Sequence, residues 1–220
     1  MTISLAYLKF LEKVNANFTN DTVSADKSRF ILLFNEVQIR YLEWLLEKRN
    51  EDSIRYAQEM VERYQNTVQT NTIQYATTPL PEDYFDLVTA RSFVRTDECA
   101  DYIELFEVKQ EHTDLYYRDA FNSPSFKYRE SFFTISNNKI RVYKKDFEVE
   151  KVELHYYRYP KDVDISGYLK IDQTHSTDID PEWDDKSVYR ILNGCAFQFN
   201  INNNNLGKVQ FDKDRIFSKI

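Results

Sequence analysis

The sequence of 220 residues predicts an α+β protein: a helical bundle body, a β-rich insertion between its third and last helices, and an extended C-terminal arm. Two observations predict this class. All five prolines and all three glycines lie after residue 78, so the first third of the chain contains no strong helix breaker. After residue 78 the chain becomes rich in tyrosine, phenylalanine, valine and isoleucine, which favour strands.

Apolar residues recur every three or four positions through the first 50 residues, which is the period of amphipathic helices. A first helix is predicted to bury one stripe made of Leu5, Leu8, Leu11, Val14 and Phe18. A second helix begins at a cap formed by Ser24 or Asp26. Its buried stripe is predicted to consist of Phe30, Leu33, Phe34, Val37, Tyr41, Trp44 and Leu45.

A third, shorter helix is predicted after the polar segment 50–52, which interrupts the second helix and supplies a new cap. The apolar residues of this third helix are Ile54, Ala57, Val61 and Tyr64. Pro79 and Pro81 then end the helical part, since proline also disfavours helical backbone in the residue before it.

The clearest strands are residues 132–136 and 139–143, which are separated by Asn137 and Asn138. Asparagine tolerates positive φ, so these two residues predict a tight hairpin turn. Further strands are predicted where apolar residues alternate with polar ones before Pro160, at Val152, Leu154 and Tyr156, and over residues 102–108. Residues 112–121 are predicted to form a short helix or turn.

A last helix is predicted to start at Asp180, with Pro181 at the first helical position, where its missing N–H is not needed. Its apolar face consists of Val188, Ile191, Leu192, Cys195 and Phe199. Gly194 lies inside this helix, which indicates close packing of the backbone against a neighbour. The predicted domains are therefore a helical body of residues 1–76 and 177–200, a β-rich insertion of residues 77–176, and an arm of residues 201–220.

Composition excludes several classes of protein. The chain has 36 acidic and 29 basic side chains and a net charge of −7, whereas a sequence-independent nucleic-acid binder is normally basic. No stretch is long and apolar enough for a membrane span, and the first residues do not resemble a signal peptide. The two cysteines, Cys99 and Cys195, are expected to be reduced thiols.

The strongest candidate for a metal site is an acidic run of Asp178, Asp180, Glu182, Asp184 and Asp185. It lacks the spacing of an EF-hand, and acidic residues at the start of a helix explain it without a metal. The three histidines are far apart in sequence and the glycines form no phosphate-binding loop. We therefore predict no catalytic, cofactor-binding or metal-binding residues; a metal-dependent hydrolase using residues 178–185 is the alternative.

Aromatic and basic residues interleave over residues 126–129 and 156–161, a mixture that can stack nucleic-acid bases or form a contact between subunits. We favour the subunit contact. The expected interface residues are Tyr84, Tyr128, Arg129, Tyr157, Arg158, Tyr159, Phe211, Ile216 and Phe217. A glycan-binding tail module is a further alternative, supported only by the aromatic content.

Several segments together carry a resemblance to a known family. They are residues 26–38, the Leu80-Pro81-Glu82-Asp83-Tyr84 motif, residues 124–130, residues 156–164 and Asp180-Pro181-Glu182. In these segments the chain resembles the ring-forming head-to-tail connector (adaptor) proteins of tailed bacteriophages, and most of all those of crAss-like phages. The asparagine run at 202–205 and the arm after it have no counterpart in this resemblance.

The resemblance implies a structural virion protein without enzymatic activity or cofactor. Its copies would form a closed ring, usually a dodecamer, in the neck at the portal vertex, after assembly in the host cytoplasm. The expected partners are the portal protein and the next tail or neck ring protein. Genomic DNA would pass through the ring without specific binding, and a net negative charge suits such a channel because basic walls would retain phosphates.

Overall fold

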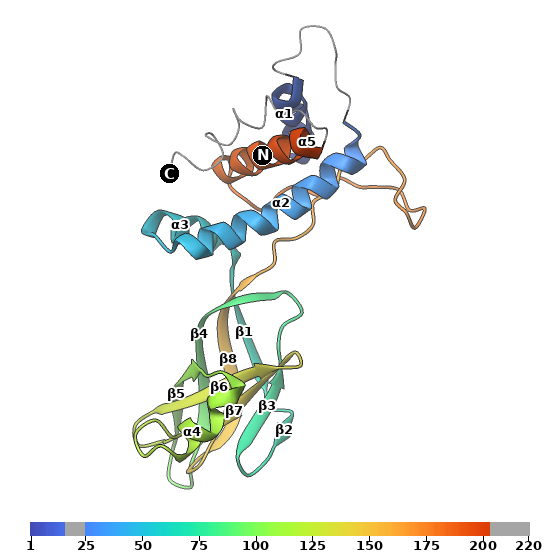
Figure 1. Cartoon of the computed structure of the whole chain (residues 1–220). Coiled ribbons are helices and arrows are strands. Elements are labelled where there is room, and N and C mark those ends of the chain that lie inside the picture. Colours follow the sequence, from blue (N-terminus) through green and yellow to red (C-terminus); the bar gives the residue numbers. More distant parts are fainter. Residues whose placement is uncertain (16–24, 203–220) are drawn as a thin grey trace. The chain divides into compact units, whose positions relative to one another are not determined.

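The computed structural model describes residues 1–15 and 25–202 (Figure 1). The chain divides into two compact units: residues 1–59 together with 160–220, called the helical unit, and residues 60–159, called the sheet unit. The predicted residues Phe18, Ser24, Phe211, Ile216 and Phe217 lie outside the described residues.

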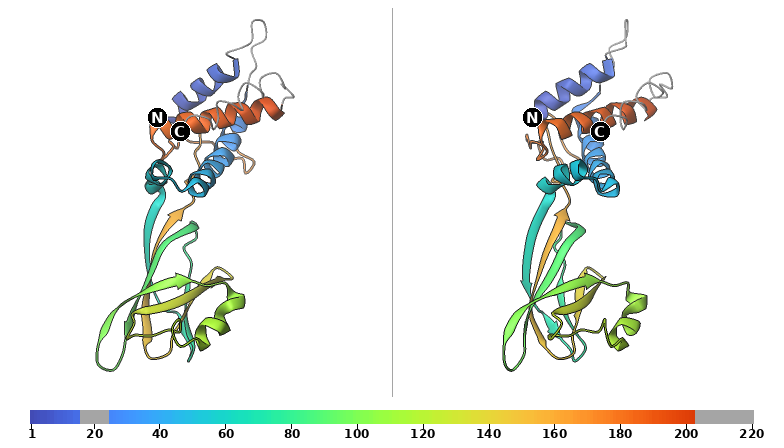
Figure 2. Two further views of the ribbon diagram at one scale, coloured as in Figure 1. Left: turned by 60° about the vertical axis from the view of Figure 1, so that its left-hand side comes forward. Right: turned by 90° about the vertical axis from the view of Figure 1, so that its left-hand side faces the viewer.

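The described residues of the helical unit form four α-helices: α1 (Ile3–Asn15), α2 (Lys27–Lys48), α3 (Glu51–Ala57) and α5 (Asp185–Asn202). Both α1 and α2 pack against α5, and α3 packs against α2 (Figures 1 and 2). A cluster of buried rings joins three of these helices, with Phe10 5.0 Å from Phe30 and 5.7 Å from Phe199 between ring centroids. The beginning and the end of the described chain therefore share one core.

Gly194 allows α5 to lie close to α2. A Cβ atom at this position would lie 2.7 Å from Cγ1 of Val37, a distance that side chains do not tolerate. The prediction of close backbone packing at Gly194 is therefore confirmed.

The start of α3 also follows the prediction. Asn50 and Ser53 form a capping box, in which the Ser53 N–H donates to Asn50 Oδ1 (2.7 Å) and the Asn50 N–H donates to Ser53 Oγ (3.0 Å). The end of α3 differs from the prediction, because the helix stops at Ala57 and β1 (Val61–Thr67) begins shortly afterwards. Val61 and Tyr64 are strand residues that pair with a segment about 90 residues further along the chain, and no local pattern reveals such a partner.

The sheet unit is built on one mixed sheet of eight strands. Besides β1, they are β2 (Thr70–Asn71), β3 (Tyr75–Pro79), β4 (Tyr84–Arg95), β5 (Ala100–Glu107), β6 (Glu130–Ser136), β7 (Lys139–Tyr143) and β8 (Glu148–Arg158). Their order is β1-β8-β4-β5-β6-β7-β3-β2, and only the β5–β6 pair is parallel among the described strands. The short helix α4 (Thr113–Arg118) lies between β5 and β6 in the chain, as predicted for residues 112–121.

The sheet is curled (Figure 2). The two edge strands, β1 and β2, follow each other in the chain with only Val68 and Gln69 between them, so the two ends of the sheet must approach each other. The Gln69 N–H donates to the carbonyl of Thr77 in β3 (2.8 Å), which holds this junction. The curl encloses a core that includes Phe133, Leu154 and Tyr156.

The hairpin prediction is confirmed. β6 and β7 pair in antiparallel register, and Ser136 lies opposite Lys139 across the turn. Asn137 and Asn138 have φ angles of 51° and 57°, which the tight two-residue turn requires.

The predicted arrangement of a helical bundle body with a β insertion is wrong. The described chain is mixed α+β. It is dominated by an eight-stranded curled sheet, which is accompanied by five helices. Two segments explain the difference. Residues 61–67 join the sheet, and residues 160–176, predicted as part of the insertion, belong to the helical unit. The units meet at residues 59/60 and 159/160 in the chain, compared with the predicted 76/77 and 176/177.

Candidate interface

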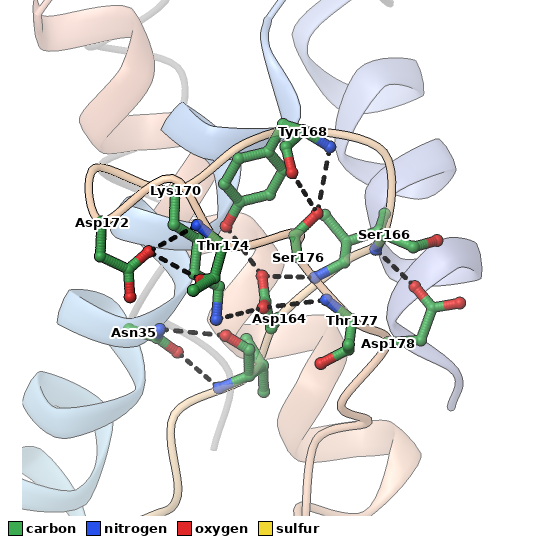
Figure 3. A network of polar contacts seen from close by, with 12 residues as sticks. Asn35, Asp164, Ser166, Tyr168, Lys170, Asp172, Thr174, Ser176, Thr177 and Asp178 are labelled. Atoms are coloured by element: carbon green, nitrogen blue, oxygen red, sulfur yellow. Dashed lines mark hydrogen bonds and ion pairs between the residues drawn. The ribbon is translucent and has the colours of Figure 1, made fainter.

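Residues 160–180, called the anchored loop, form most of the connection between β8 and α5 in the chain, and Figure 3 shows them beside Asn35 of α2. Asn35 of α2 binds the backbone of Val163 through both atoms of its amide: the Val163 N–H donates to Oδ1 (2.9 Å), and Nδ2 donates to the Val163 carbonyl (3.2 Å). Gln38, one turn further along α2, donates to the carbonyl of Lys161 (3.0 Å). Two α2 side chains thus replace the strand partner that this extended segment lacks.

Asp164 lies at the centre of the loop, with its side chain 5% exposed. Its carboxylate accepts hydrogen bonds from the Tyr168 hydroxyl (2.8 Å) and the Thr177 N–H (3.3 Å), and it pairs with Lys170 Nζ (2.7 Å), as Figure 3 shows. Burial alone would raise the pKa of Asp164, but Lys170, Tyr168 and the backbone donors outweigh burial and lower it. The ionised carboxylate therefore connects the two halves of the loop, the one before its tip and the one after it.

Further hydrogen bonds hold the two arms of the loop together. Ser176 Oγ accepts from the Tyr168 N–H (3.0 Å) and donates to the Tyr168 carbonyl (2.9 Å). The Ser166 N–H donates to Asp178 (2.7 Å), and the Ser166 carbonyl accepts from Lys27 Nζ of α2 (2.7 Å). These side-chain bonds add to backbone hydrogen bonds between the two halves of the loop, such as the one from the Ile179 N–H to the Asp164 carbonyl (2.9 Å).

The tip of the loop is a tight turn. Asp172 Oδ1 accepts from the Thr174 N–H (3.0 Å) and hydroxyl (2.7 Å), and Gln173 has a φ of 65°. This turn exposes two apolar side chains: Leu169 is 62% exposed and Ile171 is 105% exposed. An ordered turn with an apolar tip is typical of a protein contact site, since neither side chain stabilises the unit that carries it.

Helix α1 has a second exposed apolar feature. The predicted stripe is only partly correct: Val14 is buried, whereas Leu5 is 45% exposed and Leu8 is 57% exposed. The face that packs against the helical unit consists of Ile3, Ala6, Phe10 and Val14. Because α1 is apolar on two faces and uses only one of them, Leu5 and Leu8 form a candidate contact surface.

The acidic run does not form a metal site among the described residues, where no group of three or more metal-binding side chains is found. Its carboxylates have separate partners. Asp178 accepts from the Ser166 N–H, Asp180 from the Ile3 N–H (2.8 Å), and Glu182 from the Lys161 N–H (3.1 Å). Each of these three contacts fixes a different segment of the helical unit.

The cap of α5 differs from the prediction, whereas Asp185 lies in the first turn of this helix as predicted. Asp184, not Asp180, caps α5, because its Oδ1 accepts from the Ser187 N–H (2.7 Å) and its carbonyl accepts from the Val188 N–H (2.9 Å). Asp185 pairs with the amino group of Met1 (2.7 Å). The helix starts at Asp185, so the proline at 181 belongs to the preceding loop.

The sheet unit has its own buried carboxylate, Glu153 of β8, with a side chain 1% exposed. It pairs with Arg63 of β1 (2.8 Å) and Arg91 of β4 (2.7 Å), on the two strands that flank β8. Burial alone would raise the pKa of Glu153, but the two arginines lower it to about 2. His155 Nε2 lies 3.4 Å from the same carboxylate. The polar spacing along β8 did not predict Arg63 and Arg91 as partners, because both arginines lie on other strands.

The six predicted interface residues that the structure describes all lie in the sheet unit, but not in one patch. Tyr157 is buried, and Tyr84 is half-buried and has a pKa raised to about 12, mainly by burial. Arg158 pairs with Glu62 (3.1 Å), while Tyr159 is 45% exposed and packs edge-on against Phe85. These four residues lie in the paired strands β4 and β8 or directly after β8.

Tyr128 and Arg129 lie apart from the other four, in the turn before β6. Tyr128 is 65% exposed, and Arg129 pairs with Asp101 (2.9 Å). The predicted residues did not include Leu5, Leu8, Leu169 or Ile171. Leu169 and Ile171 form an apolar pair inside the mostly polar segment 166–178, and this pattern could have indicated them.

Two open hollows lie in the sheet unit. One, of about 680 Å³, is bordered by Arg95, Cys99 and Lys145. The other, of about 470 Å³, is bordered by Arg91, Glu104 and His155. The exposed thiol of Cys99 and the imidazole of His155 thus border different hollows and do not form a nucleophile–base pair.

No helix in the described part of the chain is both long enough and apolar enough to span a membrane. Comparison with known proteins adds no relative: no protein-family model matches the chain, and no curated protein matches it.

Proposed function

We propose that this chain is a structural subunit of a ring in the neck of a tailed bacteriophage, where it joins the portal to the tail and continues the DNA channel. The resemblance of the sequence to connector proteins motivates the proposal. In this role the chain has no enzymatic activity and no cofactor, and it resides in the virion after assembly in the host cytoplasm. Its partners are copies of itself, the portal protein and the next ring of the neck.

One observation carries the proposal. The described part of the helical unit exposes several apolar features, among them Leu5 and Leu8 on α1, Leu32 on α2, and Leu169 and Ile171 on the anchored loop. A closed ring needs heterologous contacts, in which one patch of each subunit meets a different patch of the next. Two unlike apolar patches on one chain are what such contacts require.

Charge supports the same role. The net charge of −7 opposes tight, non-specific binding of DNA, so a genome can slide past such a wall. The resemblance favours a dodecamer.

A metal-dependent hydrolase is less well supported, since the carboxylates of residues 178–185 each have a separate partner in the helical unit. The glycan-binding alternative has no support beyond the aromatic content.

Native mass spectrometry of the purified chain, alone and mixed with the portal protein encoded beside it, tests the proposal. We expect a closed oligomer, formed either alone or on the portal, and the same protein in electron micrographs of the phage neck. A chain that stays monomeric in both mixtures and is absent from purified particles would contradict the proposal.

A further inference from the structure

We propose that the helical unit binds one buried water molecule, which accepts a hydrogen bond from the Trp183 indole N–H and donates one to the side-chain carbonyl of Gln38. The inference does not depend on the proposed function. It assigns a ligand to two buried polar atoms, Trp183 Nε1 and Gln38 Oε1, that have no hydrogen-bond partner within the described part of the chain. Buried polar groups of folded proteins are almost always bonded either to protein or to ordered water.

Both side chains lie deep inside the unit. Trp183 is 2% exposed and Gln38 is 1% exposed, so bulk solvent does not reach the two polar atoms. A partner for them must therefore be held inside the protein.

The orientation of the Gln38 amide is fixed by its neighbours. Its Nε2 donates to the Lys161 carbonyl (3.0 Å) and to Asn35 Oδ1 (3.1 Å). Asn35 cannot turn either, because its own amide binds both the N–H and the carbonyl of Val163. Turning the Gln38 amide over would set its oxygen against two acceptors, so Oε1 keeps its position and needs a separate donor.

Two routes of contact bring the Trp183 indole to the neighbourhood of Gln38. Gln38 and Tyr41 share one side of α2, and the Trp183 ring packs edge-on against Tyr41 with 5.4 Å between ring centroids. Trp183 also follows Glu182, which accepts from the Lys161 N–H (3.1 Å), while the Lys161 carbonyl is an acceptor of Gln38. The donor and the acceptor therefore lie in one interior region, between α2 and the segment before α5.

The chemistry of the two atoms selects water. An indole N–H only donates and an amide oxygen only accepts, so the ligand must accept one hydrogen bond and donate another. The N–H repels a metal cation, and the carbonyl oxygen repels an anion. The charged side chains of this region, Lys161 and Glu182, pair with each other (3.0 Å). A small neutral molecule that both donates and accepts satisfies both atoms.

This water would extend the network that holds the anchored loop on α2. The network already runs from Val163 through Asn35 to Gln38. The water continues it to Trp183, so the start of the anchored loop and the segment before α5 are tied to the same turns of α2.

Proton NMR of the ¹⁵N-labelled full-length chain tests the inference. The chain has two tryptophans, so it gives two indole N–H signals, and Trp44→Phe assigns them. We expect a cross-peak between the Trp183 indole proton and water, with NOE and ROE of opposite sign, which is the signature of a long-lived bound water. Tyr41→Phe is the first control, because it removes a neighbouring hydroxyl that exchanges with solvent. The cross-peak should persist in this variant.

Gln38→Met tests the second partner of the water. The substitution removes the acceptor and keeps the length of the side chain, so the cross-peak should be lost. The matched control is Gln198→Met on α5, whose amide makes exposed hydrogen bonds, and it should leave the cross-peak unchanged. If Gln38→Met does not fold, a high-resolution crystal structure of the unsubstituted chain replaces it. That structure should contain one water within hydrogen-bond distance of both Trp183 Nε1 and Gln38 Oε1.

Three results would overturn the inference. They are the absence of a water cross-peak in the unsubstituted chain, an undiminished cross-peak in a folded Gln38→Met variant, and a crystal structure in which no water contacts both atoms. None of these results bears on ring formation, so the proposed function is tested separately.

Discussion

Among the described residues, each of the two units buries one ionised carboxylate, and the two carboxylates are held in different ways. Glu153 in the sheet unit is paired with two arginines, Arg63 and Arg91, on the neighbouring strands. Asp164 in the helical unit is paired with one lysine, Lys170, and with neutral donors of its own loop. Both carboxylates have lowered pKa values, although burial opposes the shift in both.

The difference lies in where the partners come from. The arginines lie 90 and 62 residues from Glu153 in the chain, whereas every described side-chain hydrogen bond to Asp164 comes from within 13 residues. The ion pairs of Glu153 therefore form only when the sheet assembles, whereas the contacts of Asp164 form when one loop folds. Both tryptophans, Trp44 and Trp183, lie in the helical unit, so their fluorescence follows that unit alone.

The largest effect is expected when Glu153 loses both partners. The double substitution Arg63→Ala and Arg91→Ala leaves a buried carboxylate with only His155 beside it, which costs up to roughly 3–5 kcal/mol. Urea unfolding followed by circular dichroism should show the loss, while the tryptophan transition stays unchanged. Hydrogen exchange should increase over β1 and β8.

The matched control is Arg95→Ala. Arg95 pairs with Glu150 (2.7 Å) on the same two strands, β4 and β8, but its side chain is 62% exposed. An exposed pair contributes less than about 1 kcal/mol, so the control should be nearly neutral. Equal effects of the control and the double variant would refute the role assigned to Glu153.

A smaller and more local effect is expected for Asp164→Ala. The substitution removes the ion pair with Lys170 and leaves the Tyr168 hydroxyl and the Thr177 N–H without their acceptor. A hydrogen bond to a charged group contributes about 1.5–3 kcal/mol, and the loss should concentrate in the loop. Hydrogen exchange of peptides covering residues 164–178 should accelerate, while the sheet unit keeps its protection. Asp162→Ala, at an exposed position, is the control and should change neither.

The stability of the sheet unit should also depend on pH in a defined window. The pKa of Glu153 is lowered from 4.5 to about 2, so its contribution is fully present above the unfolded value and is lost as the pH falls from 4.5 towards 2. Glu153→Gln should lower the stability at neutral pH and flatten this dependence. An unchanged slope in urea unfolding measured across the window would contradict the assignment.

The smallest effect is expected at the start of α5. Asp184→Ala removes the acceptor of the Ser187 N–H and should cost about 1 kcal/mol, whereas Asp184→Asn keeps the cap and should be close to neutral. Tryptophan fluorescence in urea measures both. If Asp184 were a metal ligand, asparagine would instead lower divalent-metal binding measured by calorimetry.

Local patterns predicted several elements well. The β6–β7 hairpin depends on Asn137 and Asn138, the cap of α3 on Asn50, and the close packing of α5 on Gly194, and each of these signals lies in the residues themselves. The helix α2 was also predicted within a few residues of its bounds, although Asp26 at its N-cap makes no side-chain hydrogen bond.

Other features depend on partners that are distant in the chain. Residues 61–67 have the composition of a short helix end, but pairing with β8 makes them a strand. Glu153 is one acidic residue among many in the sequence, and only the assembled sheet brings Arg63 and Arg91 beside it. The exposure of Leu5 and Leu8 on α1 was not predicted, because the helical period alone placed both residues in the core.

The sequence alone therefore determined where most helices and turns lie, and that the chain combines helices with a strand-rich region. The tertiary structure decided which face of α1 is buried, which residues close the sheet, and which carboxylates are paired. The physical reason is that period and turn chemistry act between residues a few positions apart. The choice of a buried face or a charge partner depends instead on elements that meet only in the folded chain.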